Sequence, residues 1–123
     1  MTNASMGRDN FAERFDLWNA EQKAAVKDVV KQVKDLDLEV VRISFPDQHG
    51  ILRGKTIVAD EIEAALNNGV GMVTTLLAKD TAHKTVFPWF TEGGGFGMEE
   101  MSGGGDFLMI ADPTTFRVLP WAH

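Results

Sequence analysis

The sequence has no cysteine, only three histidines and no long apolar run among its 123 residues. The absence of cysteine excludes disulfide bonds, thiolate catalysis and cysteine-based zinc sites. No apolar stretch approaches the roughly 20 residues that span a bilayer. The N-terminus, M-T-N-A-S-M-G-R-D-N, lacks the basic start and apolar run of a secretory signal. We therefore expect a soluble, cytoplasmic protein without a membrane partner.

The sequence also has fewer basic than acidic residues. The chain has 12 Lys and Arg against 18 Asp and Glu, which gives a formal net charge of −6. Because nucleic-acid phosphates bind clustered Lys and Arg, we expect no nucleic-acid partner. With 44% hydrophobic residues, a chain of this length can bury one core. We expect an N-terminal tail and aromatic segment over residues 1–18 and one domain over residues 19–123.

Two helical patterns open the chain. Phe11, Phe15 and Trp18 recur at helical spacing, which predicts three aromatic rings on one face. They pack either on the core of this domain or on a neighbouring domain or subunit. Asn19 with Gln22 resembles a capping box. It precedes valines spaced three and four residues apart, which indicate an amphipathic helix that ends near Leu36.

The stretch V-V-R-I-S-F-P-D-Q-H-G-I-L-R-G-K-T-I-V predicts a β-hairpin. Alternating apolar and polar residues over Leu38–Phe45 indicate a half-buried strand, and Ile51–Val58 returns as its partner. The turn between them has proline, an Asp47 side chain that can cap backbone N–H groups, and Gly50 for positive φ.

The remaining segments predict one more helix and three more strands. Asp60 can cap the helix E-I-E-A-A-L-N-N, and Gly69 can end it. No periodicity holds from Asp80 to Gly105, and a loop of this length is usually functional or mobile. This order predicts an α+β fold with one mixed sheet packed on a helix. The expected strands are Met72–Ala78, Phe107–Ala111 and Phe116–Leu119.

Two motifs in the chain do not support a nucleotide or metal site. The glycine runs Gly93–Gly95 and Gly103–Gly105 lack a following Lys-Ser/Thr pair, so they do not predict a phosphate loop. A metal site needs three or four converging ligands. The three histidines, His49, His83 and His123, lie far apart in the sequence and are expected to be solvated loop residues.

Two groups of residues remain as candidates for function. Arg53 and Lys55 alternate on one strand and form either a solvated basic face or a surface for another domain or an anionic substrate. Asp80, His83 and Trp89 share the long loop, where an Asp beside an aromatic ring can stabilise a small cation. Alternatively, Asp80 caps backbone and Trp89 packs in the core.

The segment F-P-D-Q-H-G-I-L-R-G-K-T-I, followed by a helix and later by G-D-F-L-M-I-A-D-P-T-T-F-R-V-L-P-W, resembles the N-terminal β-grasp domain of the glutamine synthetase family. It is most similar to the branch with γ-glutamyl-polyamine synthetases and other glutamine-synthetase-like ligases. The resemblance covers about Leu38 to Trp121 and implies a ubiquitin-like β-grasp fold.

The resemblance also implies a reaction for a longer parent enzyme. In this family ATP phosphorylates the γ-carboxylate of glutamate, and ammonia or an amine displaces the phosphate. ATP and Mg²⁺ or Mn²⁺ bind in a C-terminal catalytic domain that is missing here, so we expect no cofactor in this fragment and no activity from it alone. The N-terminal domain packs on the adjacent subunit of a homo-oligomeric ring, where one of its loops closes the active site.

An Asp on that loop helps to bind ammonium, and here this sequence departs from the family. Glutamine-forming enzymes have approximately F-D-G-S-S at this place, whereas Met72–Thr75 contains no Asp. The next acidic residue, Asp80, is therefore the candidate for the ammonium or amine side. His83 and Trp89 are candidates for the substrate loop, and Arg53 and Lys55 for contacts with another domain. The alternative function is a stand-alone β-grasp protein-interaction module.

Overall fold

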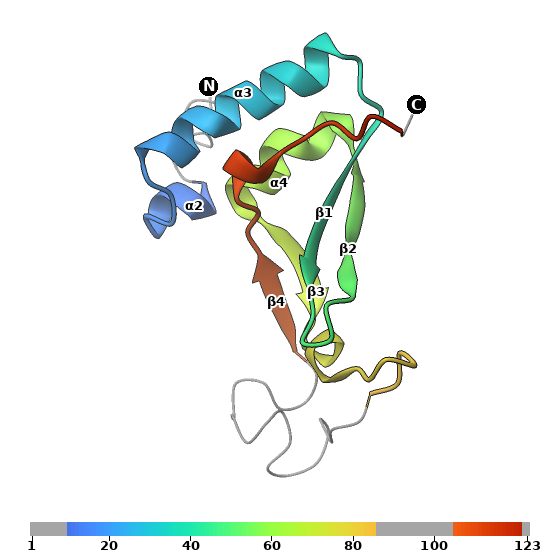
Figure 1. Ribbon diagram of the computed structural model, residues 1–123. Helices are drawn as coiled ribbons and strands as arrows, with labels where there is room; N and C mark the ends of the chain where they lie inside the picture. Colours follow the sequence, from blue (N-terminus) through green and yellow to red (C-terminus); the bar gives the residue numbers. More distant parts are fainter. Residues whose placement is uncertain (1–9, 86–104, 122–123) are drawn as a thin grey trace. The chain divides into compact units, whose positions relative to one another are not determined.

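The computed structural model describes residues 10–85 and 105–121, which form an α+β fold (Figure 1). By their contacts these residues divide into two compact units. A helical unit comprises residues 10–41, 56–69 and 110–121, and a strand unit comprises residues 42–55, 70–85 and 105–109. The α+β class is confirmed.

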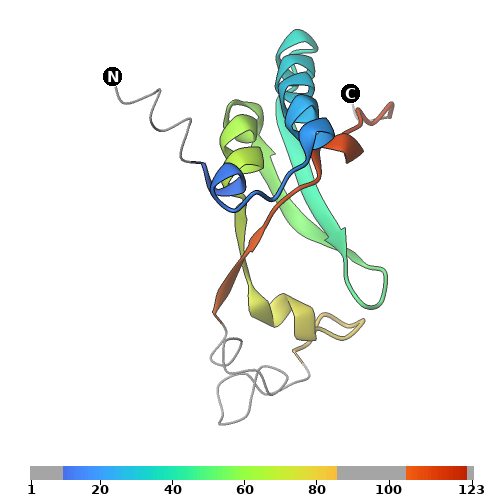
Figure 2. The ribbon, with the colours of Figure 1, turned by 90° about the vertical axis from the view of Figure 1, so that its left-hand side faces the viewer.

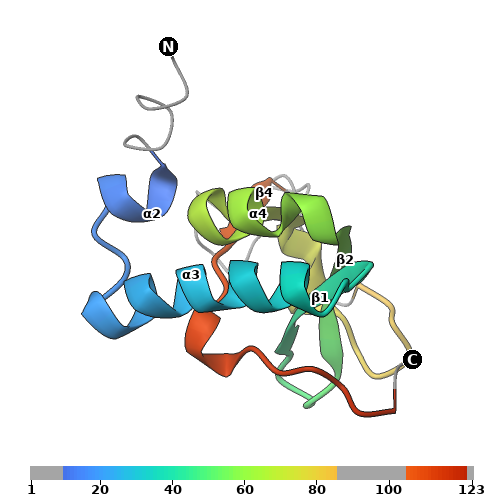
Figure 3. The same ribbon diagram turned by 90° about the horizontal axis from the view of Figure 1, so that it is seen from above.

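The described part of the helical unit contains helices α2, α3 and α4, the 3-10 turns η1 and η4, and the outer ends of β1 and β2. Figure 3 shows α3 beside α4, with η4 against α3. Helix α2 contacts α4, and the backbone N–H of Phe11 donates to the side-chain oxygen of Asn68 at 3.1 Å. The bounds are α2 Phe11–Arg14, α3 Ala20–Asp35, α4 Ile62–Asn68 and η4 Pro113–Thr115. The core of this unit contains Ala12, Trp18, Val26, Val29, Val33, Val41, Ile62 and Leu66.

Helix α3 begins as its sequence predicts. Asn19 Oδ1 accepts the N–H of Gln22 at 2.8 Å, and Gln22 Oε1 accepts the N–H of Asn19 at 3.0 Å. This reciprocal pair satisfies two N–H groups that have no partner inside the helix. The buried residues Val26, Val29 and Val33 follow at helical spacing, so the amphipathic helix is confirmed.

The aromatic segment does not form one helical face. Helix α2 ends at Arg14, and Asp16 has a positive φ of 50°, which redirects the chain. Trp18 consequently lies outside the helix and is buried in the core. Phe15 is 56% exposed, although its ring centroid lies 4.6 Å from that of Phe11. The prediction of a common face is wrong, whereas packing on the core of the chain holds for Trp18.

Helix α4 differs from the prediction at its start and agrees at its end. A 3-10 turn, η1 Ala59–Glu61, precedes it, and the capping position is Glu61 with no side-chain hydrogen bond. The prediction that Asp60 caps this helix is therefore wrong. Gly69 has a φ of 78°, which favours glycine, and this prediction is confirmed.

The strands form two hydrogen-bonded pairs in the part of the chain that the structure describes. Strands β1 Val40–Pro46 and β2 Leu52–Val58 form the predicted hairpin. Figure 2 shows the second pair side by side, and it is antiparallel, with Val70 opposite Met109 and Val73 opposite Asp106. Its strands are β3 Val70–Val73 and β4 Asp106–Met109. The expected single sheet is thus present as two separate strand pairs.

Two of the predicted strands differ in the structure: one is shorter than predicted and the other is not a strand. Strand β3 stops at Val73, and Thr74–Ala78 form the 3-10 turn η2. Both the N–H and the hydroxyl of Thr74 donate to the carbonyl of Gly105, at 2.9 and 2.8 Å. This is the next pair in the register of the β3–β4 ladder, and the chain turns after it. The segment predicted as Phe116–Leu119 is not a strand in the structure, because it leaves η4 with the side chain of Phe116 packed against the core of the helical unit.

No helix among the described residues combines the length and the apolar character needed to cross a bilayer.

Candidate functional site

The turn of the β1–β2 hairpin is organised by one carboxylate. Asp47 Oδ1 accepts the backbone N–H groups of His49 at 2.8 Å and Ile51 at 3.0 Å. Gly50 follows with a φ of 76°, and the N–H of Asp47 donates to the carbonyl of Ile51 at 2.9 Å. The predicted turn chemistry is confirmed for both Asp47 and Gly50.

Asp47 also forms a shielded ion pair with Arg53. The Nε of Arg53 lies 2.8 Å from Oδ2 of Asp47, and the two side chains are 6% and 0% exposed. Burial alone would raise the pKa of Asp47, but the hydrogen bonds from Arg53 and from two backbone N–H groups hold it below the usual value. The carboxylate is therefore kept ionised against the guanidinium.

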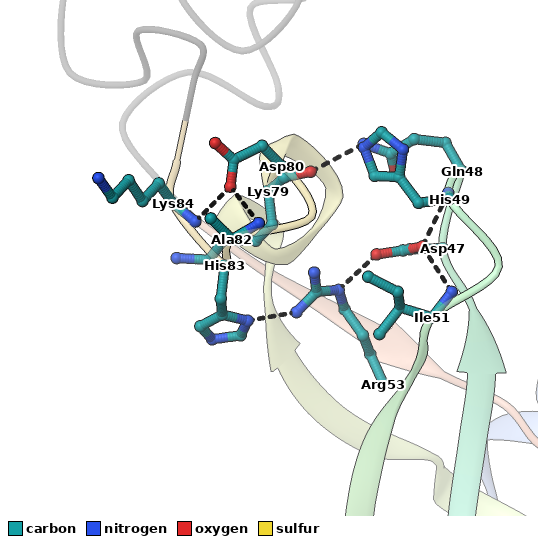
Figure 4. A network of polar contacts seen from close by, with 10 residues as sticks. All are labelled: Asp47, Gln48, His49, Ile51, Arg53, Lys79, Asp80, Ala82, His83 and Lys84. Atoms are coloured by element: carbon teal, nitrogen blue, oxygen red, sulfur yellow. Dashed lines mark hydrogen bonds and ion pairs between the residues drawn. The ribbon is translucent and has the colours of Figure 1, made fainter.

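Arg53 contacts a second loop through His83. Arg53 Nη1 lies 2.6 Å from His83 Nδ1. A guanidinium can only donate, so Nδ1 accepts and the imidazole carries its proton on Nε2. His83 also has a φ of 64°, which is uncommon for a residue with a side chain, although Asn, Asp and His adopt it more often than most. Figure 4 shows the order Asp47, Arg53, His83 from the hairpin turn to the loop.

The loop that contains His83 is held together by Asp80. Asp80 Oδ1 accepts the N–H groups of Ala82 and Lys84, both at 2.9 Å. The N–H of Asp80 donates to the carbonyl of Lys84 at 2.8 Å, and the N–H of His83 donates to the carbonyl of Asp80 at 3.0 Å. In Figure 4 the second carboxylate oxygen of Asp80 points away from these N–H groups. One carboxylate oxygen of Asp80 thus stabilises the loop through two backbone N–H groups, and the other points away from them.

A further hydrogen bond joins the hairpin turn to the same loop. Gln48 Nε2 donates to the carbonyl of Lys79 at 3.2 Å. Lys79 pairs with Thr85 as an isolated bridge, and its Nζ donates to the Thr85 hydroxyl at 2.8 Å. All of these residues belong to the strand unit, so the turn and the loop are parts of one compact body.

The two basic residues predicted to share a strand face, Arg53 and Lys55, have different surroundings in the structure. Arg53 is buried and is not part of a solvated face. Lys55 is exposed and lines an open hollow of about 470 Å³ together with Asp106 from β4. The role of Arg53 and Lys55 in contacts with another domain stays a prediction.

The structure brings Arg53, Asp80 and His83 together at one end of the strand unit. Trp89, both glycine runs except Gly105, and His123 lie outside the described residues. Sequence reasoning missed the pairing of Asp47 with Arg53. A signal existed, because an arginine on the inward face of a strand beside a turn needs a buried partner of opposite charge.

Within residues 10–85 and 105–121, no three His, Asp or Glu side chains gather closely enough to hold a metal ion. These residues therefore do not fit a metal centre. The geometry instead shows a connected polar network in which one carboxylate oxygen of Asp80 points away from its own loop, where it is suited to contact a cationic or hydrogen-donating group.

No family model matches the chain. Among curated proteins, gamma-glutamylanilide synthase from Acinetobacter sp is 37% identical over 116 residues, which cover 92% of this chain. Gamma-glutamylethanolamide synthetase GlnA4 from Streptomyces coelicolor is 38% identical over 87 residues, or 69% of this chain. Glutamine synthetase from Methanosarcina mazei is 32% identical over 95 residues, or 77% of this chain.

The chain spans only a small part of these relatives, namely 23%, 17% and 17% of their lengths. The matching region is the N-terminal part of glutamine-synthetase-like ligases. A match over 92% of the chain necessarily includes its central residues, among them Asp47, Arg53 and His83.

Proposed function

Because the chain belongs to the glutamine synthetase family, we propose that it is the N-terminal domain of a larger ATP-dependent ligase. This ligase joins ammonia or an amine to the γ-carboxylate of glutamate. The observation that carries the proposal is the 37% identity to gamma-glutamylanilide synthase over 92% of the chain. Neither the helices nor the strand pairs alone would distinguish this family from other α+β domains.

We further propose that the nucleophile is an amine rather than free ammonia. Two of the relatives are named for γ-glutamyl amides, of aniline and of ethanolamine. The segment Met72–Thr75 has no Asp, and the next acidic side chain, Asp80, presents one oxygen away from its own loop. A carboxylate in this position would stabilise positive charge on the attacking nitrogen.

The remaining parts of the proposal concern the whole enzyme. The domain completes the active site of an adjacent subunit in a homo-oligomeric cytoplasmic ring, and it is inactive alone. ATP and Mg²⁺ or Mn²⁺ bind in the catalytic domain, as the resemblance to the glutamine synthetase family implies. The metal would supply charge neutralisation at the transferred phosphoryl group.

Two measurements test this function. The first is the native reading frame beyond His123, which should continue for roughly 300 residues, enough for a separate catalytic domain. The second is glutamate- and amine-dependent phosphate release by the full-length protein with ammonia, ethanolamine, aniline and polyamines. Release that does not depend on any of these nucleophiles would refute the proposal.

A variant of Asp80 tests its role without disturbing the loop. In Asp80→Asn the amide oxygen can still accept the N–H groups of Ala82 and Lys84, while the charge is removed. We expect kcat/KM for the amine to fall about tenfold or more, with KM for ATP within twofold of wild type. Asp80→Ala, which removes both functions, should be at least as severe. An unchanged amine kcat/KM in Asp80→Asn would remove this residue from the site.

The alternative function is a stand-alone protein-interaction module. Exposed apolar side chains favour it, since Leu52 and Trp121 are 71% and 77% exposed. These surfaces are equally available to a catalytic domain of the same chain. A reading frame that stops at His123 would support the module and refute the ligase domain.

A further inference from the structure

We propose that Arg53 is a positioning residue that latches the loop of residues 79–85 to the turn of the β1–β2 hairpin and thereby sets where Asp80 is held. We call Asp47, Arg53 and His83 the Arg53 latch. The catalytic consequence rests on the proposed function, whereas the latch itself rests only on the contacts within the strand unit.

The first step is that the orientation of Arg53 is fixed from the hairpin side. Asp47 accepts two N–H groups of its own turn, so its carboxylate cannot rotate freely. Its other oxygen holds Arg53 Nε at 2.8 Å in a shielded environment. Because the guanidinium is planar, fixing Nε also fixes the direction of Nη1.

The second step is that Nη1 meets His83, which lies 30 residues further along the chain, at 2.6 Å. The N–H of His83 donates to the carbonyl of Asp80, so the imidazole and the Asp80 backbone are joined through one residue. The bond from Gln48 to the carbonyl of Lys79 holds the opposite end of the same loop. The loop is thus fastened to the turn on both sides of Asp80.

The third step concerns the backbone of His83. A φ of 64° at a residue with a side chain is uncommon, and glycine would adopt it without strain. Such a conformation persists where the surroundings determine it. Histidine is one of the few residues with a side chain that adopt this conformation readily, and here its ring also provides the acceptor for Arg53.

The fourth step is to separate the latch from the stability of the hairpin. His83→Gly removes the acceptor, fits the positive φ and leaves the ion pair of Asp47 with Arg53 intact. Arg53→Lys keeps a positive charge near Asp47 but removes the planar guanidinium that bonds Asp47 and His83 at the same time. His83→Asn restores an acceptor oxygen near the position of Nδ1 and tolerates the positive φ. His49→Ala is the matched control, because His49 is exposed and, among the described residues, bonds the turn through its backbone N–H.

Amide hydrogen exchange in the full-length protein tests the latch directly. We expect the Ala82 and Lys84 amides to exchange about tenfold faster in His83→Gly and in Arg53→Lys, since a charge-assisted hydrogen bond is lost. The double variant should exchange no faster than either single variant. His83→Asn and His49→Ala should stay within about twofold of wild type. Unchanged exchange in His83→Gly, additive effects, or faster exchange in His83→Asn would overturn the latch.

Steady-state kinetics then test its consequence for Asp80. In His83→Gly and Arg53→Lys we expect KM for the amine to rise about fivefold, with KM for ATP and glutamate within twofold, because only the position of Asp80 changes. Faster amide exchange in these variants together with an unchanged KM for the amine would refute the positioning role of Arg53. A wild-type enzyme without ligase activity would refute the proposed function, and the exchange results would still decide the latch.

Discussion

Replacing Gly54 by alanine should destabilise the hairpin strongly, although the glycine lies in a regular strand with an ordinary φ. A Cβ atom at this position would lie 1.9 Å from the carbonyl oxygen of Ile43 and 2.7 Å from Cα of Ser44. Both are backbone atoms of the partner strand, so neither can move aside as a flexible side chain would. The strands would have to separate by about 1.5 Å to reach van der Waals distance.

The expected cost follows from this distance. Overpacking in a well-packed region typically costs 1–3 kcal/mol, and a clash with backbone belongs at the upper end, so we expect about 3 kcal/mol. The whole fold is stabilised by only about 5–15 kcal/mol. At a typical urea dependence of about 2 kcal/mol per molar, the unfolding midpoint should fall by about 1.5 M.

Gly71 provides the matched control, because it also lies in a strand. A Cβ at Gly71 would have no atom within 4 Å. Gly71→Ala should therefore be neutral or stabilise by up to about 1 kcal/mol through the unfolded chain. The assay is urea unfolding of both variants by far-ultraviolet circular dichroism, which reports on the backbone. Equal midpoints for Gly54→Ala and Gly71→Ala would refute the close approach of the two strands.

Three further predictions concern stability. Asn19→Ala should lower the free energy of unfolding by about 1 kcal/mol, because it removes the cap of α3; an unchanged urea midpoint would contradict this. Trp18→Ala should cost about 3–5 kcal/mol, whereas Phe15→Ala, at an exposed ring, should cost less than about 1; similar midpoints for the two would argue against the buried position of Trp18. Because the pKa of Asp47 is lowered in the fold, its carboxylate stabilises the protein above about pH 4 and this contribution is lost as pH falls through the folded-state pKa. The deficit of Asp47→Asn in urea unfolding should therefore be largest near pH 7 and shrink towards pH 3, and a deficit independent of pH would contradict the ion pair with Arg53.

Features encoded within a few residues could be predicted from the sequence. The capping box of Asn19 and Gln22 joins residues three apart, and its geometry follows from their chemistry. The same holds for the turn at Asp47 and Gly50, where a short side chain and a positive φ decide the conformation. The family was also evident, because the motif-bearing segments over residues 45–57 and 105–121 follow one another in the order that the resemblance requires.

Features that depend on a distant partner could not be predicted. Met72–Ala78 is apolar and β-branched enough for a strand, but it pairs with the distant strand β4 only as far as Val73, with one further bond from Thr74 to Gly105, and Thr74–Ala78 form a 3-10 turn. Arg53 looked like part of a basic strand face, and only folding placed it against His83.

The sequence by itself determined the start of helix α3, the β1–β2 hairpin and the family of this protein, since these depend on local backbone preferences and on motif order. Only the tertiary structure decided where each strand stops and which charges are buried, because those outcomes depend on which remote carbonyl, carboxylate or ring is within hydrogen-bonding distance.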